Sequence, residues 1–176
     1  MLKYDLHAHS TASDGTLTPT ELIQRAHAAG IDVMALTDHD TLEGISEAAC
    51  AADQLGLQFV PGVEVSVTWD GRPIHVVGLG VDPESPALNA GLDSMRAHRQ
   101  WRAEEMGRRL EKFGIPGTYE LARQFSNGRL ISRTHFARAL VELGKAKSVR
   151  QVFQKFLVKG KPGHVQGDWV ALAEGL

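Results

Sequence analysis

Short apolar runs of strand length alternate with longer amphipathic stretches along the first 81 residues. Unbroken apolar runs bounded by turn residues predict buried strands, and apolar residues at helical spacing predict helices. The predicted strands cover residues 2–6, 33–36, 59–65, 65–69 and 73–81, and the helices between the first three cover 19–29 and 42–55. Asp70-Gly71 is typical of a tight hairpin turn between the last two strands. This order predicts a largely parallel sheet with right-handed helical crossovers, ending in a hairpin.

From residue 86 onward the apolar pattern is helical. The expected helices cover residues 87–113, 118–126, 134–143 and 148–158. We interpret this region as a helical subdomain that is inserted into the α/β framework.

Several of the predicted strands carry metal-ligand residue types, either at the strand end or within an otherwise apolar run. These residues are His7 and His9, the nearby Asp14, Asp38-His39-Asp40, Glu64, and His75. On a strand, His7 and His9 would share a face because they are two positions apart. The pair alone is equally compatible with two unrelated surface histidines. A buried carboxylate such as Glu64 is costly unless it is paired or bound to a cation, so the repeated pattern predicts a metal site.

Composition sets the broad class of the protein. The chain has 176 residues, 43% of them hydrophobic, which suffices for one core or for a core with a small attached subdomain. Its only cysteine, Cys50, cannot form an intrachain disulfide. The N-terminus has no charged leader followed by an apolar segment, and no apolar stretch approaches membrane-spanning length. We therefore expect a cytoplasmic protein without a membrane partner.

The net charge of −2 hides an uneven distribution. Residues 1–92 contain three Lys or Arg against thirteen Asp or Glu, whereas residues 93–176 contain sixteen against eight. A solvated helical surface explains many of the basic residues. The alternative is that an acidic half collects cations while a basic half attracts an anionic substrate.

Two arginines interrupt the apolar stripe of the predicted helix 87–113. Arg99 and Arg102 are three positions apart, so they share a face, and a charge on a buried face needs a partner. The partner is either a structural carboxylate or an anionic ligand, and we favour a phosphate because guanidinium groups form forked hydrogen bonds with it. For Trp101, packing in the core is favoured over stacking on a base. The segment Ser132-Arg133-Thr134-His135 opens another predicted helix. Either Arg133 and Thr134 hold a second phosphate, or Ser132 or Thr134 is an ordinary N-cap.

The combined motifs resemble the polymerase-and-histidinol-phosphatase (PHP) domain family. They are His7-Ala8-His9 with Asp14-Gly15, Thr37 to Asp40, Gly62-Val63-Glu64, and His75. The resemblance is strongest to the bacterial subgroup of nucleoside 3',5'-bisphosphate phosphatases and 5'-to-3' exoribonucleases. Further likenesses to that subgroup are Arg99 to Arg102, Ser132 to Ala137, and Gly160-Lys161-Pro162-Gly163. The resemblance spans residues 1 to about 165.

The resemblance implies an α/β fold of the PHP type, a distorted (β/α) barrel that is incomplete in this chain and carries the inserted helical subdomain. The expected division is the N-terminal part of a metal-binding barrel at 1–92, the helical insertion at 93–165, and the start of the return to the barrel at 166–176. It also implies a cluster of three divalent ions, with Mn²⁺ favoured over Zn²⁺ or Fe²⁺. The implied metal ligands are His7, His9, Asp14, His39, Glu64 and His75. The implied catalytic residues are Asp14, His39 and Glu64, and the implied substrate-binding residues are Asp14, His39, Arg99, Gln100, Trp101, Arg102, Arg133, Thr134 and His135.

The activity implied is hydrolysis of the 3'-phosphate of a nucleoside 3',5'-bisphosphate such as adenosine 3',5'-bisphosphate, or stepwise release of nucleotides from short RNA. A histidinol-phosphate-type phosphatase and a non-catalytic nucleic-acid-binding fragment are the alternatives. Members of the family continue through further strands that supply three more ligands, so we expect this chain to be a fragment whose partner is the remaining C-terminal part of the same enzyme. On its own we expect it to hold metal weakly and to catalyse little.

Overall fold

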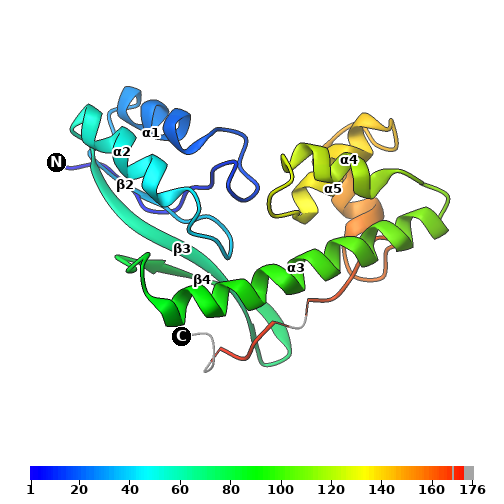
Figure 1. The fold of residues 1–176 in the computed structure, drawn as a ribbon. Coiled ribbons are helices and arrows are strands. Elements are labelled where there is room, and N and C mark those ends of the chain that lie inside the picture. Colours follow the sequence, from blue (N-terminus) through cyan, green and yellow to red (C-terminus); the bar gives the residue numbers. More distant parts are fainter. Residues whose placement is uncertain (168, 173–176) are drawn as a thin grey trace. The chain divides into compact units, whose positions relative to one another are not determined.

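The computed structural model describes residues 1–167 and 169–172 (Figure 1). The chain forms two compact units, one of residues 1–96 with 169–172 and one of residues 97–167. The long helix α3 (Pro86–Lys112) contributes to both, because the division falls after Arg96. The limits predicted from the sequence, at residues 92 and 165, stay a prediction.

The first unit is built on a four-stranded sheet in the order β1-β2-β3-β4. Its strands are β1 (Tyr4–Asp5), β2 (Val33–Leu36), β3 (Gln58–Trp69) and β4 (Arg72–Leu79). β1, β2 and β3 are parallel, and β4 returns antiparallel to β3. The predicted parallel sheet ending in a hairpin is therefore confirmed, and its mixed α/β architecture agrees with the expected fold class.

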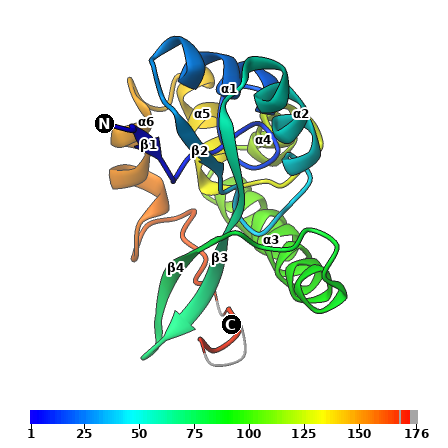
Figure 2. The same ribbon diagram turned by 90° about the vertical axis from the view of Figure 1, so that its left-hand side faces the viewer.

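Two helices cover the parallel strands, α1 (Pro19–Ala28) and α2 (Ile45–Leu55), and Figure 2 shows them from a second direction. Their small apolar residues pack against Met34 and Leu36 of β2 to form one buried cluster. Local signals define where these elements begin and end. Thr18 and Glu21 form a capping box before α1, as the sequence order of a cap residue and a glutamate three positions later favours. In the hairpin, Asp70 and Gly71 have positive φ angles of 48° and 67°, as a tight turn that matches strand twist requires.

A second cluster of the same unit lies along β3. Val63, Val65 and Val67 point to one face of the strand and are buried with Leu92 and Met95 of α3. Because side chains alternate along a strand, Glu64 points to the opposite face. The sheet thus separates an apolar core on one side from the candidate site on the other.

Two details of the strands differ from the prediction. β3 is a single twelve-residue strand rather than two runs, so Glu64 lies in its middle and not near a strand end. His75 lies within β4, as the sequence predicts. β1 ends at Asp5, so His7 and His9 follow the strand instead of sharing a face of it. The reason is pairing: Tyr4 and Asp5 are the β1 residues paired with β2, and the backbone of the following residues turns toward the loop.

The second unit is helical. It contains the end of α3, α4 (Thr118–Phe125), α5 (Arg133–Glu142), α6 (Val149–Val152) and the π-helix η1 (Phe153–Leu157). The single helix predicted at 148–158 is instead a short α-helix followed by π-helical backbone, with a hydrogen bond from the Val158 N–H to the Phe153 carbonyl of 3.1 Å. The core of this unit includes Leu110, Phe136, Leu140 and Leu157, all fully buried. No helix in the described part of the chain is both long and apolar enough to cross a membrane.

Candidate metal centre

The Glu64 carboxylate is the hub of a histidine cluster in the first unit. Its Oε2 atom lies 2.6 Å from His7 Nε2 and 2.9 Å from His9 Nε2. His39 Nδ1 lies 3.8 Å from the same oxygen, and His75 Nδ1 lies 3.6 Å from Oε1. Both carboxylate oxygens therefore face imidazole nitrogens, and these four histidines come from three different segments of the chain.

Asp14 joins the cluster beside His9. One of its carboxylate oxygens lies 3.6 Å from His9 Nδ1. Ligand atoms gather in three overlapping groups, each spanning no more than 4.8 Å: His7, His9 and Glu64; His9, Asp14 and His39; His39, Glu64 and His75. The structure thus brings together all six residues that the sequence analysis named as metal ligands.

The cluster is open at one side. The Glu64 side chain is 9% exposed and that of His39 17%, whereas that of His7 is 53% exposed. A small solute therefore reaches the cluster through His7 while the shared carboxylate stays sheltered from bulk water. Sheltered carboxylates are stabilised by nearby cationic groups, which makes this site favourable for bound cations.

The chemistry and spacing of the donors fit divalent ions. Imidazole and carboxylate ligands bind Mn²⁺, Fe²⁺ or Zn²⁺ at about 2.0–2.2 Å, so two ligands of one ion lie about 3 Å apart when they occupy neighbouring positions. The separation of 2.9 Å between His9 Nε2 and Glu64 Oε2 and the 3.6–3.8 Å separations agree with such neighbours. Mg²⁺ and Ca²⁺ suit the site less well because they prefer oxygen ligands.

Backbone pairing fixes His39 opposite Glu64. The Asp40 N–H donates to the Glu64 carbonyl at 3.0 Å, and the Glu64 N–H donates to the Asp38 carbonyl at 3.1 Å. These bonds form an isolated parallel bridge between His39 and Glu64 beyond the end of β2. Asp40, at a positive φ of 49°, is buried and accepts a 2.7 Å hydrogen bond from the Ser66 N–H. The segment after β2 thus runs beside β3, and its backbone bonds hold His39 next to Glu64 although β2 itself ends at Leu36.

Asp38 holds the loop that carries His9 and Asp14. Its carboxylate accepts hydrogen bonds from the Ser10 N–H at 2.8 Å, the Ser10 hydroxyl at 2.6 Å and the Ser13 hydroxyl at 2.5 Å. Asp38 is 1% exposed. Asp38 thus fixes the loop that presents His9 and Asp14, as residues that surround the ligands of metal sites commonly do.

A separate group of basic residues lies in the second unit. Arg99 is buried, and burial together with the charges of Arg133 and Arg99 lowers the pKa of Arg102 to about 10. Burial also lowers the pKa of His164, and Arg102, Arg133, Arg109 and Lys159 lower it further. Several cationic side chains thus lie close enough to Arg102 and His164 to lower their pKa values, so this region has a positive potential. We call Arg99, Arg102, Arg133 and His164 the arginine cluster.

The predicted substrate-binding residues Gln100, Thr134 and His135 take part in helix capping or in side-chain hydrogen bonds of the second unit. Ser132 is the N-cap of α5 and accepts a 3.0 Å hydrogen bond from the Thr134 N–H, while His135 Nδ1 accepts one of 3.1 Å from the Ser132 N–H. Ser132 is therefore the N-cap, one of the alternatives weighed for this segment, and His135, which is 1% exposed, completes the capping box. The Gln100 amide donates to Glu104 at 2.7 Å and to the Tyr119 hydroxyl at 2.8 Å.

The favoured placement of Trp101 in the core is wrong. Its side chain is 52% exposed, and its ring lies 5.2 Å from that of His98. The core position was expected because Trp101 lies between the two arginines of the predicted apolar stripe. In the structure Gln100 and Trp101 lie on the exposed face of α3, whereas Arg99 and Ala103 are buried. Stacking of a base on Trp101 stays a prediction.

Comparison with known proteins agrees with this geometry. The family model described as PHP domain matches residues 5–104, more than half of the chain. The chain belongs to the PHP domain family. The matched PHP residues include all six members of the histidine–carboxylate cluster.

Individual relatives are similar over almost the whole chain. A 3',5'-nucleoside bisphosphate phosphatase of Chromobacterium violaceum is 51% identical over 177 residues, covering 100% of this chain and 62% of the relative. A 5'-3' exoribonuclease of Haemophilus influenzae is 49% identical over 167 residues, covering 95% and 61%. The solved structure of an amidohydrolase from Chromobacterium violaceum, with bound sulfate and no metal, is 51% identical with a TM-score of 0.94, covering 98% of this chain and 61% of that one. The chain therefore spans about three fifths of the length of these proteins.

Two residues of this PHP chain were not identified as site residues from the sequence. Asp38 was noticed only as part of the Asp-His-Asp run, and its role depends on Ser10 and Ser13, which no periodicity connects to it. His164 is not among the site residues predicted from the sequence, yet it lies among arginines. The Gly160-Lys161-Pro162-Gly163 motif beside it was the available signal.

Proposed function

We propose that the protein is a metal-dependent phosphoesterase that hydrolyses the 3'-phosphate of nucleoside 3',5'-bisphosphates to give the 5'-monophosphate. The observation that carries the proposal is the convergence of four histidines and Asp14 around Glu64. Clusters of this composition bind divalent ions, and such ions activate water and neutralise phosphate charge when they are bound. The name of the bisphosphatase relative from Chromobacterium violaceum supports the choice of substrate.

In this proposal His7, His9, Asp14, His39, Glu64 and His75 hold the ions, which we take to be three, with Mn²⁺ favoured over Zn²⁺ and Fe²⁺. Glu64 presents both oxygens to the imidazoles and is the best candidate to bridge two ions. Asp14 and His39 are less buried than Glu64 and are the candidates for contact with substrate. These three residues are the proposed catalytic set.

The arginine cluster is the proposed phosphate-binding element. Guanidinium groups bind phosphate through paired, charge-assisted hydrogen bonds, and a bound anion would offset the burial and the charges of Arg133 and Arg99 that lower the pKa of Arg102. The sulfate found in a similar structure supports an oxyanion site in relatives of this chain. Gln100, Trp101, Thr134 and His135 complete the proposed set, with Trp101 the candidate to stack on the base because its ring is exposed.

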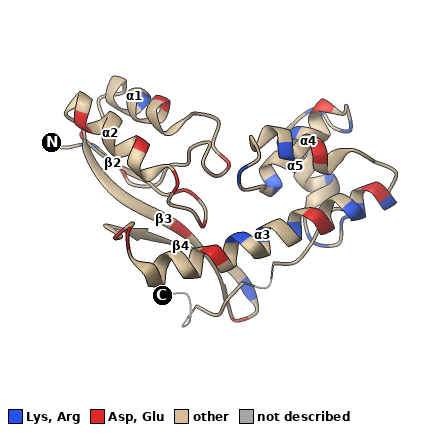
Figure 3. Ribbon diagram, viewed as in Figure 1, with Lys and Arg blue, Asp and Glu red and all other residues tan. Residues whose placement is uncertain are grey.

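Release of nucleotides from short RNA is the second candidate activity. It is favoured by the basic character of the second unit, where residues 97–167 contain fifteen Lys or Arg against five Asp or Glu (Figure 3). The 5'-3' exoribonuclease name of the Haemophilus influenzae relative supports it too. Both activities would use the same ions and the same arginines.

The test is phosphate release from adenosine 3',5'-bisphosphate by the intact protein with Mn²⁺, Zn²⁺ or Fe²⁺. Glu64→Gln keeps the size of the side chain but removes its charge, so we expect metal affinity and kcat/KM to fall by about 100-fold or more. Glu43→Gln is the matched control, because Glu43 is exposed in the same unit. It should behave as the parent protein does.

Two further substrates separate the alternatives. Histidinol phosphate turned over faster than the bisphosphate would replace the proposed substrate with that of a histidinol-phosphate-type phosphatase. Binding of RNA with no hydrolysis of any phosphate ester, unchanged in Glu64→Gln, would identify a non-catalytic nucleic-acid-binding module and refute the proposal.

A further inference from the structure

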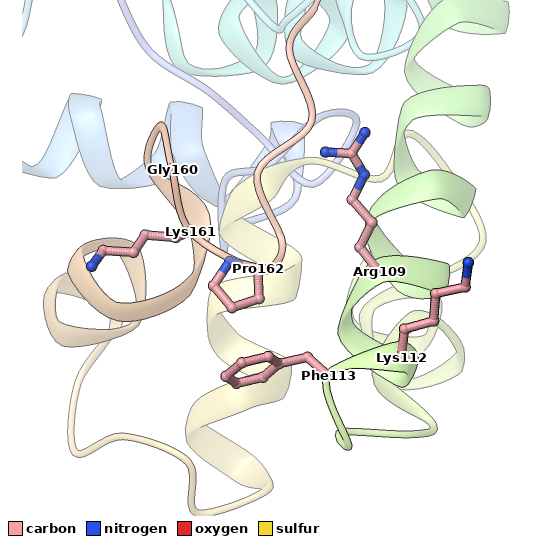
Figure 4. Close-up of a pocket in the computed structure, with 6 residues that line it drawn as sticks. All are labelled: Arg109, Lys112, Phe113, Gly160, Lys161 and Pro162. Carbon is pink, nitrogen blue, oxygen red and sulfur yellow. The ribbon is translucent and has the colours of Figure 1, made fainter.

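A hollow in the second unit combines positive charge with exposed rings. It has a volume of about 450 Å³ and is lined by Arg109, Lys112, Phe113, Gly160, Lys161 and Pro162 (Figure 4). In Figure 4 the ammonium groups of Lys112 and Lys161 extend to opposite sides, and the rings of Phe113 and Pro162 lie between them. No residue proposed for catalysis or phosphate binding lines this hollow.

The lysines and the phenylalanine are available to a ligand. Among the described residues, no carboxylate forms an ion pair with Lys112 or Lys161, and both side chains are exposed. Phe113 is 58% exposed although its edge packs on Phe156, with ring centroids 6.4 Å apart. An exposed ring flanked by two cations suits a ligand that carries both a flat base and phosphates.

The hollow adjoins the arginine cluster through the segment 160–165. Arg109 donates a 2.6 Å hydrogen bond to the His164 carbonyl, and Arg102 donates one of 3.2 Å to the Val165 carbonyl. Gly163 allows this close approach, because a Cβ there would lie 3.0 Å from Leu110 Cδ2. The hollow and the cluster are therefore two ends of one track along α3 whose basic residues include Arg102, Arg109 and Lys112; Arg109 is also paired with Glu105 at 2.7 Å.

The length of the track sets the size of the ligand. Arg102, Arg109 and Lys112 lie on the same helix, and ten residues at about 1.5 Å each give about 15 Å from the first to the last. A stacked nucleic-acid strand advances about 3.4 Å per nucleotide, so this distance corresponds to roughly four nucleotides. A mononucleotide bound at the arginine cluster would not reach Lys112.

We propose that this hollow binds the downstream nucleotides of a single-stranded RNA whose first phosphate is held by the arginine cluster. Lys112 and Lys161 contact the backbone phosphates, and a base stacks on Phe113. The proposal rests on the proposed function for the position of the first phosphate. It makes the protein prefer oligonucleotides over dinucleotides.

The experiment measures fluorescence anisotropy of a labelled, 5'-phosphorylated octaribonucleotide and of a dinucleotide, with the intact protein in the presence of chelator so that nothing is hydrolysed. For Lys112→Ala/Lys161→Ala we expect octaribonucleotide affinity to fall by about tenfold, and the slope of log affinity against log salt to decrease by about 1.4, since each phosphate contact contributes about 0.7. Phe113→Ala should weaken binding by about tenfold with no change in slope. Dinucleotide binding should change much less in both variants.

The matched control is Lys145→Ala/Lys147→Ala, which removes two other exposed lysines of the same unit. We expect parental affinity and slope for this control. Equal losses in the two lysine pairs, or equal losses for both probe lengths, would overturn the assignment of the hollow. Because hydrolysis is not measured, a failure of the phosphoesterase proposal would appear only in the phosphate-release assay and would leave these results unchanged.

Discussion

Asp38 shows how a residue outside the set of candidate ligands can determine the geometry of a candidate metal site. Its buried carboxylate accepts three hydrogen bonds from Ser10 and Ser13, which flank the turn between His9 and Asp14. Asp38 itself follows β2, directly before His39. One carboxylate thereby connects the two loops that supply four of the candidate ligands. Its contribution lies in positioning, because its oxygens are occupied by serine donors.

Replacing Asp38 by Asn should loosen this connection. The amide oxygen accepts hydrogen bonds but the NH₂ group does not, so at least one buried donor loses its acceptor at a cost of about 1–3 kcal/mol. We expect unfolding by urea at a correspondingly lower concentration, and metal affinity about 10- to 100-fold weaker, as for other outer residues of metal sites. Asp53→Asn, exposed in α2, is the control. Unchanged metal affinity in Asp38→Asn would contradict the positioning role.

Helix boundaries were more predictable than strand positions, because the interactions that define a helix end connect residues that are close in the sequence. Thr18 and Glu21 act on each other within one turn of helix, so the start of α1 can be read from adjacent letters. The position of Glu64 within a long strand depends instead on pairing with β4 and with the His39 segment, up to 26 positions away. The residue types of the metal cluster were therefore predictable, while the loop position of His7 and His9 and the support from Asp38 were not.

The caps of α5 and α6 allow a test of whether helix geometry positions the arginine cluster. Ser132→Ala removes the acceptor for the Thr134 N–H and should lower the free energy of unfolding by about 1 kcal/mol. Because Arg133 is the first residue of α5, sulfate affinity should fall by several-fold, which calorimetric titration measures. Ser148→Ala removes the corresponding cap of α6, with a similar effect on stability. Its sulfate affinity should stay at the parental value, and an equal loss in both variants would show that general destabilisation is responsible.

The two units differ in chemistry as well as in structure. The first contains the histidine–carboxylate cluster and most of the acidic residues, and the second contains fifteen of the nineteen Lys and Arg residues. Each has its own buried core. A cation and an oxyanion should therefore stabilise different parts of the chain, since a ligand stabilises the structure that forms its site.

Hydrogen exchange followed by mass spectrometry can measure this separation in the intact protein. At about 100 times its dissociation constant, Mn²⁺ should stabilise its site by about 2.7 kcal/mol, which slows exchange there by about 100-fold. We expect this protection in residues 7–15, 37–40 and 62–66, which surround the histidine–carboxylate cluster, and little change in α4. Sulfate should protect the start of α5 and residues 160–165 and leave the 62–66 segment unchanged. Glu64→Gln should abolish the response to Mn²⁺ but keep the response to sulfate. Protection of α4 and α5 by Mn²⁺ without protection of residues 62–66 would place the cation outside the cluster.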